Sequence, residues 1–274
     1  MENPVVIVIP ARYGSTRLPG KPLVKIGGTE MVKRVAAIAD CVCRRETGCS
    51  YLVATDDDRI ARFCDSNGIP VMPTSPDCGS GTERCWDAVR GLSRRPELIV
   101  NLQGDNPLCP PHVVQDLIAA WRQKAADVYT SCVHLSWDEY DRLRADKEET
   151  PYSGTTVIMD KFDMALAFSK SILPVIRNIA KAKELHARSP VFRHTGLYAY
   201  TYDSLKSYFS LEKSVYEEGY AEGLEQMRFL YNGKKIHMVK VDYGGRPTTS
   251  GVDSPEDIVR VEAIIEQYGE LDLR

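Results

Sequence analysis

The stretch that decides the fold is Val5-Val-Ile-Val-Ile9 followed by Pro10-Ala-Arg-Tyr-Gly-Ser-Thr-Arg-Leu-Pro-Gly-Lys-Pro-Leu23. A continuous β-branched run is typical of a strand buried on both faces, as in parallel sheets covered by helices. The glycines and prolines that follow predict a loop. Because ligands of such folds bind beyond the carboxyl ends of the strands, the loop over residues 10–23 is a candidate binding site.

Strand and helix patterns alternate through the rest of the first half. Hydrophobic periodicity predicts, in order, a helix over Glu30–Cys43, a strand over Tyr51–Thr55, a helix over Asp58–Ser66, a strand over Ile69–Met72, a helix over Thr82–Leu92, a strand over Glu97–Leu102, and a helix opened by Pro110 and Pro111 that runs to Lys124. This alternation indicates an α/β fold whose parallel strands are joined by right-handed crossovers.

The second half has a mixed pattern. We expect strands over Thr155–Met159, near Phe168, over Gly196–Tyr200 and over Lys235–Val241, with helices over Glu218–Leu230 and Ser254–Gln267. The last helix has a suitable start, since Ser254 can cap it and Pro255 suits a first turn. A connection over residues 171–193 carries five cations, Arg177, Lys181, Lys183, Arg188 and Arg193.

The composition indicates a large globular domain. The chain has 274 residues, 43% hydrophobic and 27% charged, which is enough for a sizeable core. A net charge of −3 argues against a nucleic-acid-binding surface. The apolar run at residues 5–9 is too short for a signal or a membrane span, so the cytoplasm is the expected compartment. The eight cysteines lack a CxxC pair and are expected to be mostly buried apolar residues rather than zinc ligands.

The loop over residues 10–23 has the chemistry of a triphosphate cradle. It carries Arg12, Arg17 and Lys21, the hydroxyls of Ser15 and Thr16, and glycines that let backbone amides approach a phosphate. It matches neither the GxxxxGK[ST] phosphate loop nor the GxGxxG dinucleotide motif. The alternative is a solvated basic turn.

Two aspartates are candidate metal ligands. Asp105, in Gln103-Gly-Asp-Asn-Pro107, follows the predicted strand that ends at Leu102, and Asp253 precedes the last helix. Magnesium prefers one or two carboxylates together with phosphate oxygens. The alternatives are a turn aspartate that caps its own backbone and an ordinary acidic residue at a helix start.

Two further segments offer polar groups for a ligand. Gly79-Ser80-Gly81-Thr82-Glu83-Arg84 lets a backbone approach a ligand before a helix, or is a plain loop with a Thr82 cap. His194 and Tyr198 lie four residues apart along a predicted strand, and Glu225 and Gln226 lie on a predicted helix. These last groups could bind the hydroxyls of a sugar acid, although each taken singly is more often structural.

The ordered set of these motifs resembles the 3-deoxy-manno-octulosonate cytidylyltransferase (CMP-KDO synthetase) family. The resemblance covers residues 4–265 and is carried by IPARYGSTRLPGKPL, ATDDDRI, SGTER, NLQGDNP, RHTGLYAY, LEQMR and GVDSPED. It implies a Rossmann-like nucleotidyltransferase fold, with a mainly parallel sheet, helices on both faces and a smaller dimerisation and acceptor-binding element. Within one domain, residues 1–125 are expected to bind mainly the nucleotide and residues 126–235 mainly the acceptor.

The resemblance also implies roles for individual residues. Nucleotide binding would fall to Pro10, Ala11, Arg12, Ser15, Arg17, Lys21, Ser80, Gly81, Arg84 and Gln103, and acceptor binding to Gln103, Lys170, His194, Tyr198, Glu225 and Gln226. Asp105 and Asp253 would hold Mg²⁺, and catalysis would depend on Arg12, Lys21 and Asp105. The implied enzyme is a cytoplasmic homodimer of lipopolysaccharide biosynthesis that transfers CMP from CTP to a KDO-like acid, acting on neither nucleic acid nor membrane.

Several positions depart from the family pattern. The family usually has glutamate where Asn106 stands, arginine where Lys170 stands and a cation in the strand that here contains Thr156, and the connection over residues 175–192 also differs. Lysine cannot make the planar bidentate contact that arginine makes with a carboxylate. A cytidylyltransferase for amino-KDO, another ulosonic acid or a phosphonate is therefore an alternative, as is a non-catalytic nucleotide-binding homologue.

Overall fold

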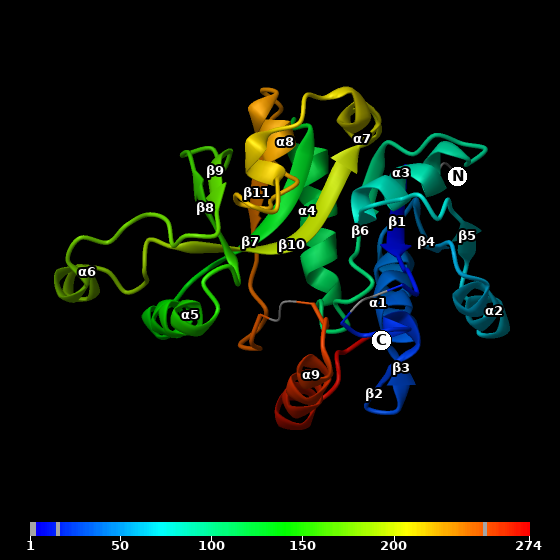
Figure 1. Cartoon of the computed structure of the whole chain (residues 1–274), viewed down its shortest axis with the longest axis horizontal. Coiled ribbons are helices and arrows are strands. Elements are labelled where there is room, and N and C mark those ends of the chain that lie inside the picture. The colour runs from blue at the N-terminus through cyan, green and yellow to red at the C-terminus, as the bar shows by residue number, and fades with distance from the viewer. Residues whose placement is uncertain (1–3, 15–16, 249–250) are drawn as a thin grey trace. The chain divides into compact units, whose positions relative to one another are not determined.

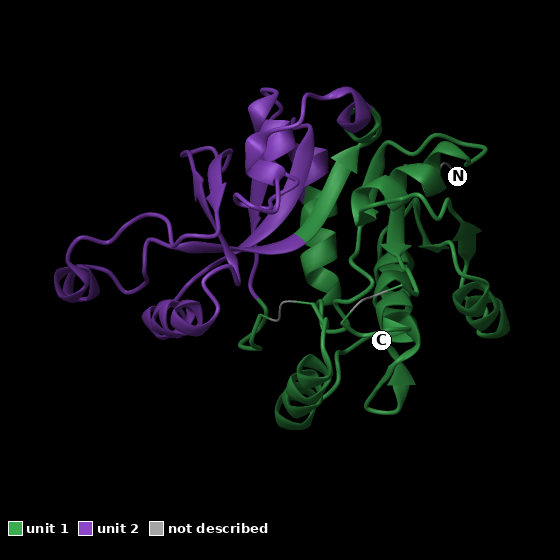
Figure 2. Cartoon of the chain, viewed as in Figure 1, with its two compact units in different colours: residues 1–119, 197–206, 243–274 green, residues 120–196, 207–242 purple. Residues whose placement is uncertain are grey.

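The computed structural model describes residues 4–14, 17–248 and 251–274, and the chain divides into two compact units (Figure 2). Unit 1 is formed by Met1–Ala119, Leu197–Lys206 and Tyr243–Arg274. Unit 2 is formed by Ala120–Gly196 and Ser207–Asp242. Strand β10 (Phe192–Thr201) supplies its first half to unit 2 and its second half to unit 1.

A mainly parallel sheet forms the centre of unit 1. Its strands are β1 (Val5–Pro10), β4 (Cys49–Thr55), β5 (Val71–Pro73), β6 (Leu98–Asn101) and the second half of β10. They run in the order β10-β6-β1-β4-β5, with β1 parallel to both β4 and β6, and with β10 antiparallel to β6. The run at Val5–Ile9 is buried, as expected for a central strand.

Helices cover both faces of this sheet (Figure 1). The helices packed on it are α1 (Met31–Arg45), α2 (Asp58–Ser66) and α3 (Gly81–Arg90). Unit 1 also contains the first part of α4 (Pro111–Gln123), α7 (Tyr202–Ser207) and α9 (Pro255–Tyr268). The crossovers through α1 and α2 run in one direction along the sheet and the crossover through α3 runs in the other. Because such crossovers are right-handed, α1 and α2 lie on one face and α3 on the opposite face.

A small second core fixes the segment before α9. It contains Ile26, Met31, Leu108, Val252, Val261 and Ile264. Ile26 belongs to a hairpin of β2 (Lys25–Ile26) and β3 (Thr29–Glu30), which follows the turn η1 (Lys21–Leu23). Val252 therefore anchors its neighbour Asp253 to the packed interior of unit 1.

Unit 2 is a mixed α/β layer. Its sheet contains β7 (Val128–His134), β8 (Thr155–Met159), β9 (Ala165–Ser169), the first half of β10 and β11 (Ile236–Lys240). β11 is parallel to β7, while β8 is antiparallel to both β10 and β9. The remaining elements are α5 (Trp137–Glu149), α6 (Ile179–Leu185), α8 (Met227–Tyr231), η2 (Tyr208–Ser210) and η3 (Val215–Glu217).

Most predicted elements are present, and one helix prediction is wrong. The helix over Asp58–Ser66 has the predicted bounds, and Ser254 caps α9 in a capping box with Asp257. The expected helix over Glu218–Leu230 is reduced to α8, which begins at Met227. Gly223 adopts φ 62, a left-handed conformation that glycine accepts at little cost. This conformation interrupts the helix, so the residues before it are not helical despite the helical spacing of their side chains.

The prediction that most of the cysteines are buried is confirmed. The buried ones are Cys41, Cys64, Cys85, Cys109 and Cys132. Within residues 4–14, 17–248 and 251–274, every helix is too short or too polar to cross a membrane.

Candidate active site

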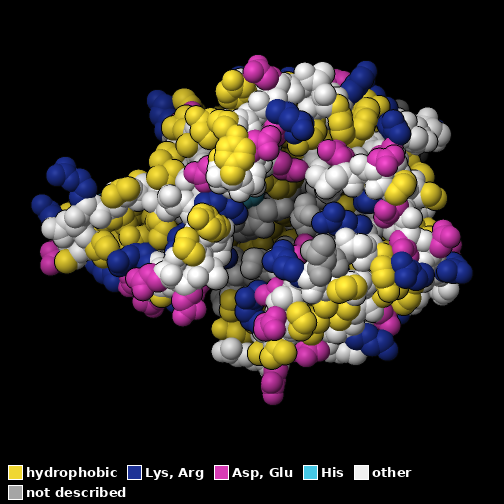
Figure 3. All heavy atoms as spheres, in the orientation of Figure 1, with side chains coloured by type: hydrophobic (Ala, Val, Ile, Leu, Met, Phe, Trp, Pro, Cys, Tyr) yellow, Lys and Arg dark blue, Asp and Glu magenta, His cyan; other side chains and the backbone are white. Residues whose placement is uncertain are grey.

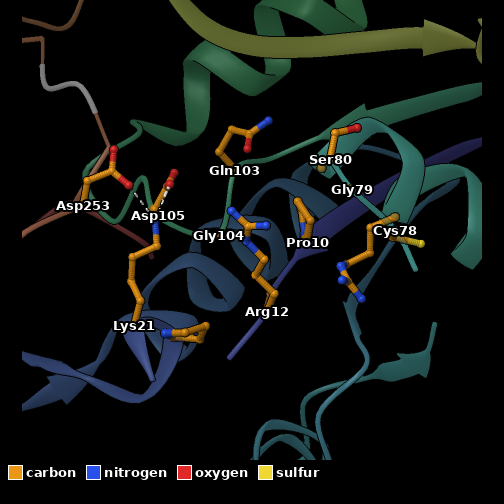
Figure 4. A pocket seen from close by; sticks show the side chains of 14 residues that line it. Pro10, Arg12, Lys21, Cys78, Gly79, Ser80, Gln103, Gly104, Asp105 and Asp253 are labelled. Atoms are coloured by element: carbon orange, nitrogen blue, oxygen red, sulfur yellow. Dashed lines mark hydrogen bonds and ion pairs between the residues drawn. The ribbon is translucent and has the colours of Figure 1, made fainter. Parts of the chain in front are cut away.

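A pocket lies at the carboxyl ends of β1 and β6 in unit 1, at the position expected for a parallel sheet (Figure 4). It is lined by Pro10, Ala11, Arg12, Lys21, Pro22, Cys78, Gly79, Ser80, Gly81, Arg84, Gln103, Gly104, Asp105 and Asp253. Every described nucleotide candidate except Arg17 is in this set, and so are both metal candidates. The pocket therefore brings together four of the motifs singled out in the sequence.

Close packing of two chain segments shapes the floor of the pocket. A Cβ atom added at Gly104 would lie 2.3 Å from the carbonyl oxygen of Pro10. Any side chain at residue 104 would thus force the segment after β6 away from the end of β1. The glycine keeps Gln103 and Asp105 beside Pro10, Ala11 and Arg12 in the same pocket wall.

Asp105 and Asp253 converge on one ammonium group (Figure 4). Lys21 Nζ lies 2.7 Å from Asp105 Oδ2 and 3.0 Å from Asp253 Oδ1. The partners are 84 and 232 residues from Lys21 along the chain. Tertiary packing alone brings these three groups together.

The backbone before α9 holds the two carboxylates close to each other. Val252 N donates a hydrogen bond to the Asp105 carbonyl oxygen over 2.8 Å. A Cβ atom added at Gly251 would lie 2.7 Å from Asp105 Oδ1, so the bare glycine backbone lies directly against that carboxylate. Asp253 N in turn donates to Asp257 Oδ2 over 2.8 Å, which ties the second carboxylate to the start of α9.

The opposite charges of Lys21 and of the two aspartates, Asp105 and Asp253, stabilise one another. Burial by itself would lower the pKa of Lys21, but the carboxylates of Asp105 and Asp253, through charge and hydrogen bonding, raise it above its ordinary value. Lys21 therefore remains a cation throughout the physiological range. Arg17, although 68% exposed, adds a second cation through an ion pair of 2.9 Å with Asp253 Oδ2.

The two aspartates suit a divalent cation. Each turns a carboxylate oxygen toward the same positive centre, the Lys21 ammonium, so the two carboxylates lie close together. Among the described residues there is no group of three or more His, Cys, Asp or Glu side chains able to hold a metal. Two carboxylates completed by phosphate oxygens and water form the ligand set that Mg²⁺ favours over a closed protein cage.

The opposite wall of the pocket is the start of α3 (Figure 4). Ser80 caps this helix by accepting from Glu83 N over 3.1 Å. The cap suggested for Thr82 is thus wrong, since Thr82 is buried inside the helix and its hydroxyl meets that of Tyr200 at 3.2 Å. Ser80 and Gly81, at the start of α3, line the pocket, and a helix N-terminus suits an anionic ligand.

Arg84 lines the pocket but is already paired. Its Nη1 lies 3.1 Å from Asp56 Oδ1 and donates to Thr74 Oγ1 over 2.6 Å, and the side chain is 3% exposed. A buried arginine held in this way is rigid, so it shapes the pocket as well as adding charge. Ser15, the remaining nucleotide candidate, lies outside the described residues, as does Thr16.

The acceptor candidates belong to both units. Gln103 and Tyr198 are in unit 1, where the ring of Tyr198 stacks on that of Tyr200 with centroids 5.8 Å apart. Lys170, His194, Glu225 and Gln226 are in unit 2. The prediction that Glu225 and Gln226 lie on a helix is wrong, because both precede α8 in a turn-rich segment with Gln226 at the cap position.

His194 is enclosed in the interior of unit 2. Its Nε2 lies 2.8 Å from Thr130 Oγ1, and the ring of Phe168 packs edge-on against it. Burial, together with the charge of Lys170, lowers the pKa of His194 to about 3. The imidazole is therefore neutral at physiological pH and suited to hydrogen bonding rather than to carrying charge.

Cations gather around Lys170 in unit 2. Burial lowers the pKa of Lys170, although the nearby charge of Glu222 opposes this. Burial also lowers the pKa of Lys147, and the positive charges of Lys170 and Arg193 lower it further. Glu222 accepts from Ser169 Oγ over 2.8 Å and from Lys170 N over 2.6 Å, which fixes the backbone at this position.

Pro22, Gly79 and Gly104 line the pocket from motifs that the sequence indicated, although no role was predicted for them, and Cys78 lies outside every predicted motif. Sequence reasoning also missed Asn101, the last residue of β6. Asn101 is fully buried, and its two amide atoms have no hydrogen-bond partner among the described residues. Its Nδ2 lies 3.6 Å from where a Gly81 Cβ would be, immediately behind the pocket wall. A polar residue that ends an otherwise apolar strand was the available signal.

The known proteins most relevant to this pocket are cytidylyltransferases, and the chain is similar to them over nearly its whole length. A family model described as "Cytidylyltransferase" matches residues 6–236. The 3-deoxy-manno-octulosonate cytidylyltransferase of Maricaulis maris is 42% identical over 268 residues, covering 97% of this chain and 99% of the relative. The protein of the same name from Porphyromonas gingivalis is 34% identical over 270 residues, covering 98% and 99%.

Two solved structures are also similar to this chain. The structure described as CMP:2-keto-3-deoxy-manno-octonic acid synthetase complexed with CTP has a TM-score of 0.80 and 34% identity, covering 96% of this chain and 99% of that one. A cytidylyltransferase from Leptospira borgpetersenii, at 18% identity and a TM-score of 0.58, shares the fold.

Proposed function

This chain belongs to the cytidylyltransferase family, and within it to the 3-deoxy-manno-octulosonate cytidylyltransferases, and we propose that it transfers CMP from CTP to a KDO-like sugar acid with release of pyrophosphate. The observation that carries the proposal is the convergence of Asp105 and Asp253 on Lys21 in the pocket at the end of β1. This arrangement combines a fixed cation with two carboxylates beside helix-terminal amides, which suits a triphosphate.

The proposed step is an in-line displacement at the α-phosphorus of CTP. A bond forms between an acceptor hydroxyl oxygen and the α-phosphorus, and the bond from that phosphorus to the bridging oxygen of pyrophosphate breaks. The hydroxyl proton leaves to solvent or to a phosphate oxygen. For a KDO-like acid the attacking group is the anomeric 2-hydroxyl. Catalysis of this kind depends on positioning and on neutralising negative charge.

Arg12 and Lys21 are proposed to bind the leaving pyrophosphate. Both line the pocket, and Lys21 retains its positive charge because the two aspartates raise its pKa. Arg17 is proposed to help from the exposed side of the cluster, where it pairs with Asp253. The amides at the start of α3, capped by Ser80, would contact the nucleotide from the opposite wall.

We propose that Asp105 and Asp253 hold Mg²⁺ together with the triphosphate. When bound there, the ion would polarise the phosphate and lower the pKa of a coordinated hydroxyl. Asp105 is held by the Lys21 ion pair and by the neighbouring backbone of residues 251 and 252, so its carboxylate is fixed before substrate arrives. Asp253 is positioned through its bond to Asp257.

The acceptor is proposed to be an anionic sugar acid. Lys170 and Arg193, whose charges both act on Lys147, supply positive charge in unit 2 that suits a carboxylate. His194, neutral and hydrogen-bonded, suits a sugar hydroxyl. An acid other than KDO, such as amino-KDO, another ulosonic acid or a phosphonate, is also compatible with Lys170, because a lysine ammonium does not require a planar partner.

A homodimer in the cytoplasm is proposed as the working form. Val175 and Leu185 are 78% and 65% exposed, and apolar and basic side chains gather on the arm of unit 2 that carries α6 (Figure 3). No disulfide joins any of the eight cysteines, all of which are described, in keeping with a reducing compartment.

The proposed dimer is tested by light scattering, which should give a dimer mass for the wild type and a smaller mass for Leu185→Glu. Val259→Glu, at an exposed position of α9, is the control that should leave the mass unchanged.

The proposed activity is tested by pyrophosphate release. The protein is mixed with Mg²⁺, one nucleoside triphosphate and one acid from a panel of KDO, amino-KDO, nonulosonic acids and small phosphonates. Release is expected with CTP and a KDO-like acid, and it should disappear in Asp105→Asn. Release with a triphosphate other than CTP would contradict the proposed cytosine specificity. Release with a different acid would identify that acid as the acceptor in place of a KDO-like one. Failure with every acid would support a non-catalytic nucleotide-binding homologue.

A further inference from the structure

Two thiols outside the pocket lie unusually close together. Cys43 is in the last turn of α1, and Cys49 is the first residue of β4. Their Sγ atoms are 3.1 Å apart, closer than two sulfur atoms in ordinary non-bonded contact. A small rotation of the two side chains would bring them to bonding distance.

The backbone fixes this approach. Glu46 N donates to the Val42 carbonyl over 2.9 Å at the end of α1, and Cys49 N donates to the Glu46 carbonyl over 3.2 Å in the turn that follows. The side chain of Glu46 accepts from Gln115 Nε2 over 3.1 Å, which ties the turn to α4. The proximity of the sulfurs is thus a property of the packed turn between α1 and β4.

The pair is also more accessible than five of the other six cysteines. Cys41, Cys64, Cys85, Cys109 and Cys132 are buried. Burial raises the pKa of the Cys64 thiol to about 11 and that of Cys109 to about 12, so these groups stay protonated. Cys43 and Cys49 are half-buried at the surface of unit 1, where a small oxidant can reach them.

We propose that Cys43 and Cys49 are a thiol-oxidation site that closes to a reversible disulfide by exchange with a small-molecule disulfide such as glutathione disulfide. The thiolate of one cysteine attacks glutathione disulfide, forms a mixed disulfide and releases one glutathione thiolate. The second cysteine then attacks the protein sulfur of that mixed disulfide and releases the second glutathione. The two protein thiols lose two electrons and two protons in total, and glutathione disulfide is reduced to two thiols.

The position of the pair predicts what the bond does. Cys49 stands opposite Val5 at the amino ends of β4 and β1, whereas the pocket is at the opposite end of β1, where Pro10 pairs with Ala54. A disulfide between α1 and β4 would restrict the unfolded chain without altering the pocket. We therefore expect the oxidised protein to have a melting temperature higher by about 5 °C and an unchanged kcat.

The test uses the full chain in glutathione buffers of graded redox potential. Intact-mass measurement and peptide mapping should show the loss of two hydrogens, located at Cys43 and Cys49 and restored by dithiothreitol. Cys43→Ser and Cys49→Ser should each prevent this loss and leave a stable glutathione adduct on the remaining cysteine. Cys78→Ser removes a different half-buried thiol and should retain the loss.

Three results would overturn the proposal. The first is a wild-type protein that keeps all eight thiols in the most oxidising buffer. The second is a disulfide that maps to another pair. The third is a wild-type glutathione adduct that never resolves, since that would mean the second sulfur cannot attack. A disulfide at the proposed pair without a rise in melting temperature would refute its stabilising role.

Discussion

The pocket of unit 1 and the acceptor candidates of unit 2 present polar groups in different ways. In unit 1, Lys21, Asp105 and Asp253 come from loops that follow strands or precede a helix, and they neutralise one another's charge. In unit 2, His194 lies on strand β10, and its ring contacts Thr130 and Phe168. The side chain of Glu222 accepts a hydrogen bond from the backbone of Lys170. The first set is a charged cluster open to a ligand, and the second is built into a packed sheet.

This difference explains why the nucleotide side is easier to recognise. A loop at a strand end must carry charge and glycine for phosphate binding, and such residues have few structural alternatives. A polar residue within a sheet can serve the fold or the ligand, and its residue type does not distinguish the two. The following four variants test this contrast.

The largest effect is expected from Asp105→Asn. This change keeps the size of the side chain but removes the charge that faces Lys21, and we expect kcat to fall by roughly a thousandfold. Pyrophosphate release at saturating CTP and acceptor measures it, with a thermal melt as the control for folding. Wild-type turnover in the variant would remove Asp105 from the chemistry.

The second-largest effect is expected on the binding of CTP, the nucleotide donor. Lys21→Ala removes a charged contact worth about 1.5–3 kcal/mol, so the KM for CTP should rise about tenfold or more. The KM for the acceptor acid should stay within about twofold, because no acceptor contact is assigned to Lys21. Unchanged CTP kinetics would refute the role of the loop over residues 10–23.

The third effect concerns the stability of unit 2. Because burial lowers the pKa of His194 from its ordinary value of 6.5 to about 3, the unfolded chain binds a proton between these values that the folded chain does not. The free energy of unfolding should therefore fall as pH drops below 6.5, by about 2 kcal/mol between pH 7.5 and pH 5.

Urea denaturation of wild type and His194→Gln at both pH values isolates this contribution. The variant should lose about 2 kcal/mol of the difference, while the share from His237, whose pKa burial also lowers, should remain. Substitution of the exposed His186 by glutamine should leave the whole difference intact. Equal pH dependence in wild type and His194→Gln would mean that His194 is protonated normally in the folded protein.

The smallest effect is expected at the acceptor. Lys170→Arg restores a planar, bidentate partner for a carboxylate, and the KM for KDO should fall a few-fold while the KM for CTP stays the same. Steady-state kinetics with each substrate varied in turn measures both. If KDO is already an excellent substrate of the unchanged protein, position 170 does not signal a different acid.

The local elements of this protein can be predicted from short stretches of its sequence. The β-branched run at Val5–Ile9, the bounds of α2 and the Ser254 cap of α9 depend on nearby residues, so their patterns could be interpreted without a structure. The loop over residues 10–23 was identifiable as a ligand site for the same reason, since a charged, glycine-rich loop after a buried strand is a local pattern.

The grouping of side chains in the pocket depends instead on packing between segments that are distant in the sequence. The convergence of Asp105 and Asp253 on Lys21 depends on Gly251 lying against the Asp105 carboxylate, a contact between distant segments that no local pattern records. The expected helix over Glu218–Leu230 was shortened because a left-handed Gly223 outweighed side-chain periodicity. Propensity acts between neighbours in the chain, whereas charge pairing and close backbone packing act between neighbours in space.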